Sequence, residues 1–137
     1  MQKIYFARID KNGYVNIQET TRTVPETEYQ LYETIKVLLE GVSNQESENG
    51  LVSFIPKNAE LIYVQIKNNI AYINFNESFL EQEYGLEGAR IQLQQIVYTA
   101  TEFPEIHSVQ ILINERKETF LGETGFFIGR ELKREMF

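Results

Sequence analysis

The chain has 137 residues, the length of one ordinary domain, and 42% of them are hydrophobic. Its formal net charge of -7 disfavours contact with phosphate backbones and anionic membrane surfaces, so we expect neither nucleic-acid binding nor direct membrane insertion. The absence of cysteine excludes disulfides, thiolate catalysis and cysteine-ligated zinc.

A β-hairpin is the first predicted element. Lys3–Ile9 and Tyr14–Thr23 are rich in β-forming residues, and Asp10–Gly13 between them contains an Asn-Gly turn signal. Asp10 could also begin an EF-hand calcium loop, but that loop needs glycine where Val15 stands. We therefore interpret the segment as a turn.

A helix is predicted next. Thr23 and Glu26 have the spacing of a capping box, and Pro25 suits a first helical turn, so we expect the helix to begin at Thr23. Gly41 can end it. Its apolar stripe comprises Leu31, Ile35, Leu38 and Val42.

The acidic, aperiodic segment Ser43–Gly50 is predicted to be a loop. Glu46 and Glu48 could bind a cation there, but no neighbouring cluster supports a site. Leu51–Leu61 is predicted to be a short extended segment containing a proline.

Ile62–Phe75 alternates with period two and predicts a second hairpin, with its turn at Asn68-Asn69. The alternation fixes the register, because a slip of one residue would mix the two faces. The predicted apolar pairs are Ile66 with Ala71, Val64 with Ile73, and Ile62 with Phe75. The opposite face pairs Gln65 with Tyr72 and Tyr63 with Asn74.

A second helix is predicted from Glu87 or Gly88 to Phe103, where Pro104 stops it. Its buried stripe comprises Leu93, Ile96, Val97, Ala100 and Phe103. Its other side, expected to face solvent, comprises Gln92, Gln95, Thr99 and Glu102.

Ser108–Asn114 is then predicted to be a strand, with Val109, Ile111 and Ile113 on one face. Glu115–Gly129 is expected to form a charged turn followed by strand and loop. The charged C-terminus is expected to fray.

The predicted order is therefore β-β-α-β-β-α-β with further extended structure at the C-terminus. We expect an α+β fold in which two helices pack on one face of a mixed β-sheet.

One stretch, Ile96–Asn114, gathers residue types that are typical of active sites: Tyr98, Thr99, Thr101, Glu102 and the only histidine, His107. We interpret the first four as the flanks and polar face of the second helix. His107 is interpreted as a loop histidine, with a catalytic base as the minor alternative.

Glu77, Glu81 and Glu83 cluster in one connection, but nothing there indicates burial or a partner that would perturb a carboxylate. The chain has no glycine-rich phosphate loop and no Gly-x-Ser-x-Gly motif. We predict no catalytic, cofactor-binding or metal-binding residues and no cofactor.

Taken in order, the motifs of the chain resemble those of the GerMN domain family. They are "IYF", "RTVPETEY", "IKVLLEG", "GLVSFIPKNAEL", "VQIKNNIAYINFNESF", "QIVYTATEFPEIHSVQILIN" and "FLGETG". The tightest pieces are "LLEG", Ile55-Pro56 and "YTATEFP". Gly41-Val42 departs from the family's common Gly-Pro, and Gly122 and Gly125 only partly match a C-terminal glycine pair.

The resemblance implies that residues 1–137 are a single GerMN-like domain, similar to ring-building motifs. Such domains are not enzymes and work by protein association outside the cytoplasmic membrane, behind a lipid anchor or membrane helix. No apolar run approaches the roughly 20 residues of a membrane span, and Met1 leads directly into a strand pattern instead of a signal peptide. The residues alone leave open a cytoplasmic protein or the folded part of a longer, anchored one.

The resemblance and the residue types together lead to three hypotheses about function. The first is a non-catalytic, envelope-associated assembly domain that binds protein partners or itself, with Tyr63 and Tyr72 as candidate contacts. The second is a module that binds cell-wall glycan, such as peptidoglycan, or a small molecule through its tyrosines and amides. The third is a hydrolase built on acidic residues, with Glu102 or His107 as the residues to test.

Overall fold

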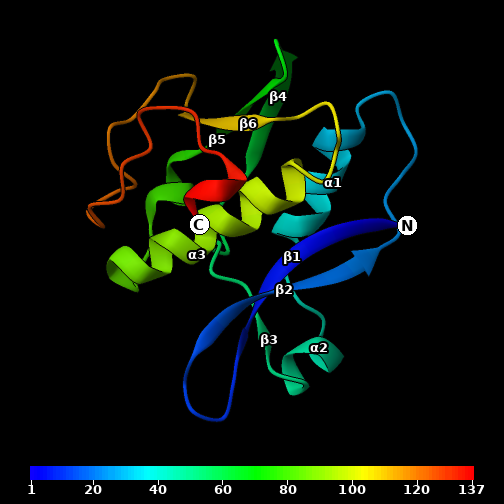
Figure 1. The fold of residues 1–137 in the computed structure, drawn as a ribbon, viewed down its shortest axis with the longest axis vertical. Coiled ribbons are helices and arrows are strands. Elements are labelled where there is room, and N and C mark those ends of the chain that lie inside the picture. Colours follow the sequence, from blue (N-terminus) through cyan, green and yellow to red (C-terminus); the bar gives the residue numbers. More distant parts are fainter.

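Two three-stranded sheets lie towards opposite ends of the molecule, with the long helix α3 between them (Figure 1). The structure, a computed structural model, describes residues 1–137 throughout. Its strands are β1 (Gln2–Ile9), β2 (Val15–Arg22), β3 (Leu51–Val52), β4 (Leu61–Lys67), β5 (Ile70–Phe75) and β6 (Ser108–Ile113). Its helices are α1 (Gln30–Leu39), α2 (Asn44–Glu48), α3 (Gly85–Ala100) and two 3₁₀ turns, η1 (Glu77–Leu80) and η2 (Arg134–Met136).

The predicted α+β class is confirmed, but the single mixed sheet is wrong. The N-terminal sheet has the order β2-β1-β3 and is antiparallel throughout. The second has the order β4-β5-β6, in which β4 and β5 are antiparallel and β5 and β6 are parallel, with α3 as the crossover. Two sheets form because α3 is buried on two sides. β1 of the first sheet packs against one side, and the β4-β5-β6 sheet packs against the other.

Most of the β4–β5 register is confirmed. Asn68 and Asn69 adopt φ of 54° and 65°, as a two-residue turn requires, and Val64 pairs with Ile73. One pair is wrong, because Leu61 and not Ile62 lies opposite Phe75. Ile62 is the extra residue of a bulge and is 45% exposed.

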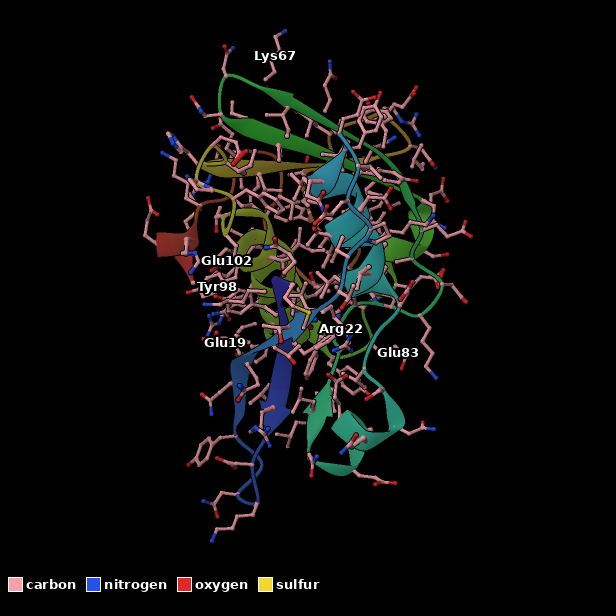
Figure 2. All side chains as sticks on the ribbon, turned by 90° about the vertical axis from the view of Figure 1, so that its right-hand side faces the viewer. Glu19, Arg22, Lys67, Glu83, Tyr98 and Glu102 are labelled. Carbon is pink, nitrogen blue, oxygen red and sulfur yellow. The ribbon has the colours of Figure 1, made fainter.

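β4 forms one outer edge of its sheet and has β5 as its single strand neighbour. Figure 2 shows Lys67, at the end of this strand, at one extremity of the molecule. The other edge, β6, is covered by the C-terminal segment, which forms isolated bridges at Val109 with Leu132 and at Ile113 with Arg116.

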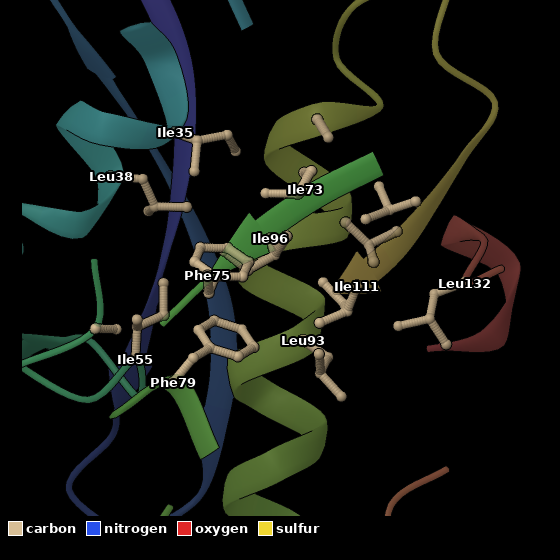
Figure 3. Close-up of a cluster of buried hydrophobic side chains, with 14 of the residues drawn as sticks. Ile35, Leu38, Ile55, Ile73, Phe75, Phe79, Leu93, Ile96, Ile111 and Leu132 are labelled. Carbon is tan, nitrogen blue, oxygen red and sulfur yellow. The ribbon is translucent and has the colours of Figure 1, made fainter. Parts of the chain in front are cut away.

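The hydrophobic core lies between α3 and the β4-β5-β6 sheet, with α1 at its side (Figure 3). Ile96 and Leu93 of α3 pack towards Ile73 and Phe75 of the sheet, as predicted. The rings of Phe75 and Phe79 stack with centroids 3.9 Å apart, which joins η1 to the same core. Burial of these side chains is the main stabilising contribution of the fold.

The predicted solvent-facing side of α3 is wrong for three of its four residues, since Gln92, Gln95 and Thr99 are fully buried. Each side chain bonds to a backbone group of another segment: Gln92 donates to the Phe79 carbonyl, and Thr99 accepts from the Tyr5 amide. Buried polar groups are tolerated when they are hydrogen-bonded, and here they attach the helix to its surroundings.

Two further predictions of local structure are wrong, the start of the first helix and the loop that follows it. The capping box at Thr23 does not form, and α1 begins at Gln30, because the residue before Pro25 is biased towards extended backbone. Ser43–Gly50 is not only loop, since α2 forms there with a capping box between Ser43 and Glu46.

None of the helices has the length and hydrophobicity that crossing a membrane requires.

Candidate functional site

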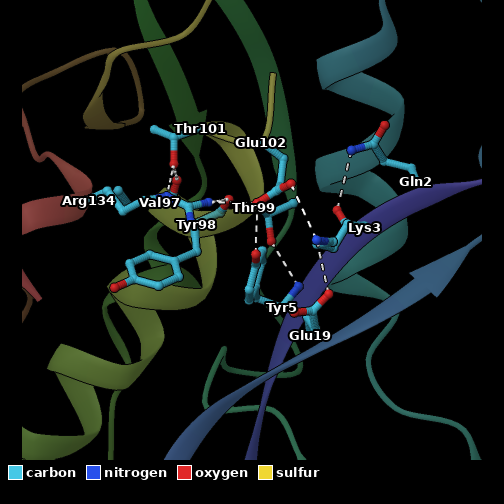
Figure 4. Close-up of polar contacts among 10 residues, drawn as sticks. All are labelled: Gln2, Lys3, Tyr5, Glu19, Val97, Tyr98, Thr99, Thr101, Glu102 and Arg134. Atoms are coloured by element: carbon cyan, nitrogen blue, oxygen red, sulfur yellow. Dashed lines mark hydrogen bonds and ion pairs between the residues drawn. The ribbon is translucent and has the colours of Figure 1, made fainter. Parts of the chain in front are cut away.

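The active-site-like residues at the end of α3 form a compact polar cluster with β1 and the C-terminus (Figure 4). The Tyr5 hydroxyl donates a hydrogen bond to Oε2 of Glu102 over 2.7 Å. Nη2 of Arg134 donates to the same oxygen over 2.9 Å. The prediction that Glu102 faces solvent is only partly right: its side chain is 22% exposed, but it is bonded on two sides and forms the centre of this cluster.

Arg134 closes the cluster from the C-terminal side. Its Nη2 also donates to the Tyr98 carbonyl over 2.8 Å, and its Nε donates to the Thr101 hydroxyl over 2.9 Å. The guanidinium lies 4.3 Å from the ring centroid of Tyr98. Because a cation at a helix C-terminus satisfies terminal carbonyls and the helix dipole, Arg134 stabilises the last turn of α3.

The predicted frayed C-terminus is therefore wrong. Arg134 is fixed by these contacts, and the ring of the last residue, Phe137, stacks on Phe126 with centroids 6.0 Å apart. No local pattern marks Arg134 or Tyr5 as members of the cluster, because they lie 32 and 97 positions from Glu102 in the chain.

The electrostatics of the cluster favour a charged Glu102. Burial acts to raise the pKa of this carboxyl, but the hydrogen bonds from Tyr5 and Arg134 outweigh it, and the net pKa is lowered. Burial and the bond to Glu102 raise the pKa of Tyr5. A general acid needs the opposite shift of its carboxyl pKa, so the geometry is typical of a structural contact and not of acid catalysis.

The other acidic and basic candidates lie elsewhere. His107 has an exposed side chain in the loop before β6, outside the cluster. Glu77 accepts a hydrogen bond from the Asn114 amide, whereas Glu81 and Glu83 line a shallow hollow beside η1. His107 and Glu77 thus lie apart from the hollow that Glu81 and Glu83 share, and no group of three or more histidine, aspartate or glutamate side chains is placed to hold a metal ion.

A second ion pair fixes α2. The Glu46 carboxylate accepts from Nη1 of Arg22 over 2.5 Å and from Nη2 over 2.6 Å. These bonds lower the pKa of Glu46, against the opposing effect of burial. The same carboxylate accepts from the Ser43 amide over 2.8 Å, so it completes the capping box as well. The Ser43-x-x-Glu46 spacing was a signal for this helix in the sequence.

An apolar groove lies where the β1–β2 hairpin passes the N-terminal turns of α3. It encloses about 520 Å³. The registers Ile9 with Val15 and Ala7 with Val52 place the strand side chains of the groove on one face of the sheet. Its principal lining residues are Ile9, Val15, Val52, Phe54, Tyr84 and Ile91.

Several side chains of the groove are open to solvent, with Tyr84 69% exposed and Ile9 43% exposed. Tyr84 rests edge-on against Phe54, with ring centroids 5.8 Å apart. Exposed apolar patches of this kind are typical of interaction sites. The sequence prediction of Tyr63 and Tyr72 as contacts missed this groove, because it combines four separate segments.

The fold and the sequence both have known relatives. The family model "Germane: Sporulation and spore germination" matches residues 3–119. The spore germination protein GerM of Bacillus subtilis (strain 168) is 30% identical over 127 residues, which are 90% of this chain and 33% of GerM. The chain thus spans about a third of the length of that relative.

Solved structures agree. The first GerMN domain of the Bacillus subtilis sporulation protein GerM has a TM-score of 0.75 and 26% identity, with 98% of each chain covered. The tandem GerMN domains of GerM have a TM-score of 0.74 and 26% identity, over 99% of this chain and 46% of theirs. A Clostridium perfringens protein described as a lipoprotein shares the fold, with a TM-score of 0.70 and 24% identity over 97% of this chain and 86% of its own.

The family model spans most of the chain, and the tertiary structure matches a GerMN domain over nearly its whole length, which confirms the resemblance noted in the motifs. The chain belongs to the GerMN family, the Germane domains of sporulation and spore germination.

Proposed function

We propose that residues 1–137 act as one non-catalytic protein-association domain in sporulation or spore germination. The observation that carries the proposal is the apolar groove at Ile9, Val15 and Tyr84, which leaves hydrophobic side chains exposed. The acidic groups with perturbed pKa values, Glu46 and Glu102, are instead occupied by internal arginine partners. These two carboxylates are therefore committed to internal contacts, whereas the groove offers an exposed contact surface, which supports an association role.

The groove is suited to a protein partner because it is lined by apolar and aromatic side chains. Aromatic side chains that become buried at the centre of a protein interface often contribute a large share of the binding free energy. One solved structure of GerM contains two GerMN domains in tandem, which supports a role in which such a domain lies beside another folded domain.

Site-specific photo-crosslinking in the native organism tests this function. A photoreactive phenylalanine analogue is placed at Tyr84 in the full-length protein, with a matched control at Tyr29. Both tyrosines precede a helix and are similarly exposed, at 69% and 66%. We expect a discrete protein adduct from position 84 and none from position 29. Equal labelling at both positions, or no adduct at position 84, would contradict the proposal.

Cell-wall glycan is the alternative ligand, and the hollow next to the groove is where it would bind. Its lining includes Phe54, Gln82 and Tyr84. However, the amide of Gln82 already donates to the Phe54 carbonyl and to Gln92, and it accepts from the Tyr84 amide. The Gln82 amide is therefore not free to bind a sugar, although other polar side chains, Lys57, Asn58, Glu81, Glu83 and Glu123, also line the hollow. We prefer a protein partner because the adjoining groove is lined mainly by apolar side chains. Retention of the chain on purified peptidoglycan would reverse this preference.

We further propose that the domain works outside the cytoplasmic membrane, held by a lipid anchor or membrane helix beyond these residues. The support is membership of a family that includes a spore germination protein. Protease added to protoplasts of the native organism is expected to degrade the domain while a cytoplasmic marker survives. Protection of both proteins would contradict this location.

A further inference from the structure

The two edges of the β4-β5-β6 sheet differ in their covering. At the β6 edge, Val109 and Leu132 exchange two backbone hydrogen bonds of 2.9 and 2.7 Å, and the Ile113 amide donates to the Arg116 carbonyl. At the β4 edge no strand or bridge is present. The chain therefore covers one edge of this sheet itself and leaves the other available.

The hairpin geometry identifies the backbone groups at the free edge. In an antiparallel hairpin with a two-residue turn, the residues that flank the turn, Lys67 and Ile70, exchange hydrogen bonds. The N–H and C=O groups of every second residue point to the same side of a strand, so those of Tyr63 and Gln65 also bond to β5. The N–H and C=O groups of Val64 and Ile66 consequently point outwards.

This free edge is apolar and lacks the acidic charge of the rest of the chain. Exposed edges are normally protected by charged residues, especially lysine, by bulges or by covering segments. β4 has such features only at its two ends, the bulge at Ile62 and the charge of Lys67, and residues 63–66 between them have none. β4 carries one charge, Lys67, and no acidic residue, although the chain has 20 acidic residues. Ile66 is 50% exposed. The other long edge strand, β2, is protected in the ordinary way, since it carries Glu19 and Arg22.

We propose that β4 pairs antiparallel with β4 of a second copy of this chain, about a two-fold axis at Gln65. This inference rests on the proposed association function and names one surface and its occupant. We choose this register because it is the two-fold arrangement that pairs both outward-facing residues within residues 63–67, so that Val64 of each copy lies opposite Ile66 of the other.

The strand is self-complementary in this register. On the opposite face each Lys67 meets the ring of Tyr63 from the second copy, a favourable cation–aromatic contact, and no like charges lie opposite each other. Gln65 lies opposite itself, where two amides can bond. The bulge at Ile62 ends the regular strand, which limits the pairing to residues 63–67.

The pairing is expected to be weak. Five residues from each copy bury far less than the roughly 1,200 Å² of a stable interface. A dissociation constant on the order of 10⁻⁴ to 10⁻³ M is expected, and association then depends on a high local concentration, as among chains held on one surface.

Disulfide trapping tests the register directly, because the chain has no cysteine. Gln65→Cys places two thiols opposite each other in a non-hydrogen-bonded pair, where Cα atoms are about 4.5 Å apart and a disulfide can form. Asn16→Cys, on the exposed β2 edge, is the matched control. In mild oxidant, Gln65→Cys is expected to form covalent dimer at least about tenfold faster than Asn16→Cys.

A second substitution and a label-free measurement complete the test. Adding Ile66→Lys to the Gln65→Cys chain places a charge against the apolar partner and is expected to reduce trapping to the control rate, with circular dichroism verifying the fold. Sedimentation equilibrium of the unaltered chain is expected to show a mass that rises from 16.1 kDa with concentration.

Equal trapping rates for Gln65→Cys and Asn16→Cys would overturn the β4 pairing. If photo-crosslinks at Tyr84 persisted in that case, the association function would stand and the pairing alone would fail. Rapid trapping at Gln65 without adducts at Tyr84 would leave the pairing intact and overturn the proposed role of the groove.

Discussion

Replacing Gln95 with alanine should destabilise the protein strongly, because this buried side chain joins α3 to two other segments. Its Oε1 accepts from the Phe54 amide over 2.8 Å, and its Nε2 donates to the Tyr5 carbonyl over 3.1 Å and to the Ser53 hydroxyl over 3.2 Å. The variant loses three hydrogen bonds and leaves backbone groups unpaired in the interior.

The size of the effect follows from these contacts. Each neutral hydrogen bond contributes about 1 kcal/mol, and a buried group left unpaired costs about 1–3 kcal/mol. We expect the free energy of unfolding to fall by roughly 3–5 kcal/mol, or about 10–20 °C in Tm for a chain of this size. If Gln95 faced solvent on an amphipathic helix, the substitution would leave the free energy of unfolding almost unchanged, because alanine is a good helix former.

Urea unfolding followed by circular dichroism measures the change. Glu87→Ala, in the first turn of α3 with a side chain that is 71% exposed, is the matched control; it loses an exposed ion pair with Arg90 and should lower the free energy by less than about 1 kcal/mol. If Gln95→Ala changed it by less than about 0.5 kcal/mol, the burial and bonding described for this face of α3 would be refuted.

Two further changes test the polar cluster and the C-terminal loop. At neutral pH, Glu102→Gln should lower the free energy of unfolding by roughly 1–2 kcal/mol, because it removes the charged acceptor of Arg134, which is itself partly exposed. The folded-state pKa of Glu102 is lowered, so its contribution is present above the ordinary glutamate pKa and is lost as pH falls through the folded value. Urea titrations at neutral pH and at about pH 3 should therefore show a smaller difference in acid, and a constant difference would contradict the charged interaction. Gly122→Ala should cost more than about 2 kcal/mol, because φ is +53° and the new Cβ would overlap the Leu80 carbonyl oxygen. Gly125→Ala, with φ of +84° and open space around it, is the control, and equal losses of Tm in the two variants would show that the overlap carries no cost.

The sequence by itself determined the features that depend on neighbouring residues. Period-two alternation and the Asn68-Asn69 turn define the β4–β5 hairpin, because a hairpin's register is set by its turn and by which side chains are apolar. Pro104 and the apolar spacing in α3 likewise predict a helix of nearly the right extent and its core face. The order of these motifs was sufficient to identify the family.

The tertiary structure alone decided where polar side chains go. Gln95 and Thr99 lie on the polar side of α3, which a periodicity argument assigns to water. They are buried because the backbone of β1, some 90 positions away, supplies hydrogen-bond partners. Arg134 bonds to Glu102 because the C-terminal segment, 32 positions further along the chain, packs against the end of α3.

The groove and the open edge of β4 could not be predicted from the sequence for a related reason. The groove exists because the hairpin carrying Ile9 passes the start of α3, and the open edge of β4 exists because the C-terminal segment covers β6 instead. Local patterns fix the conformation of each segment, whereas burial and exposure depend on which distant segment packs against it.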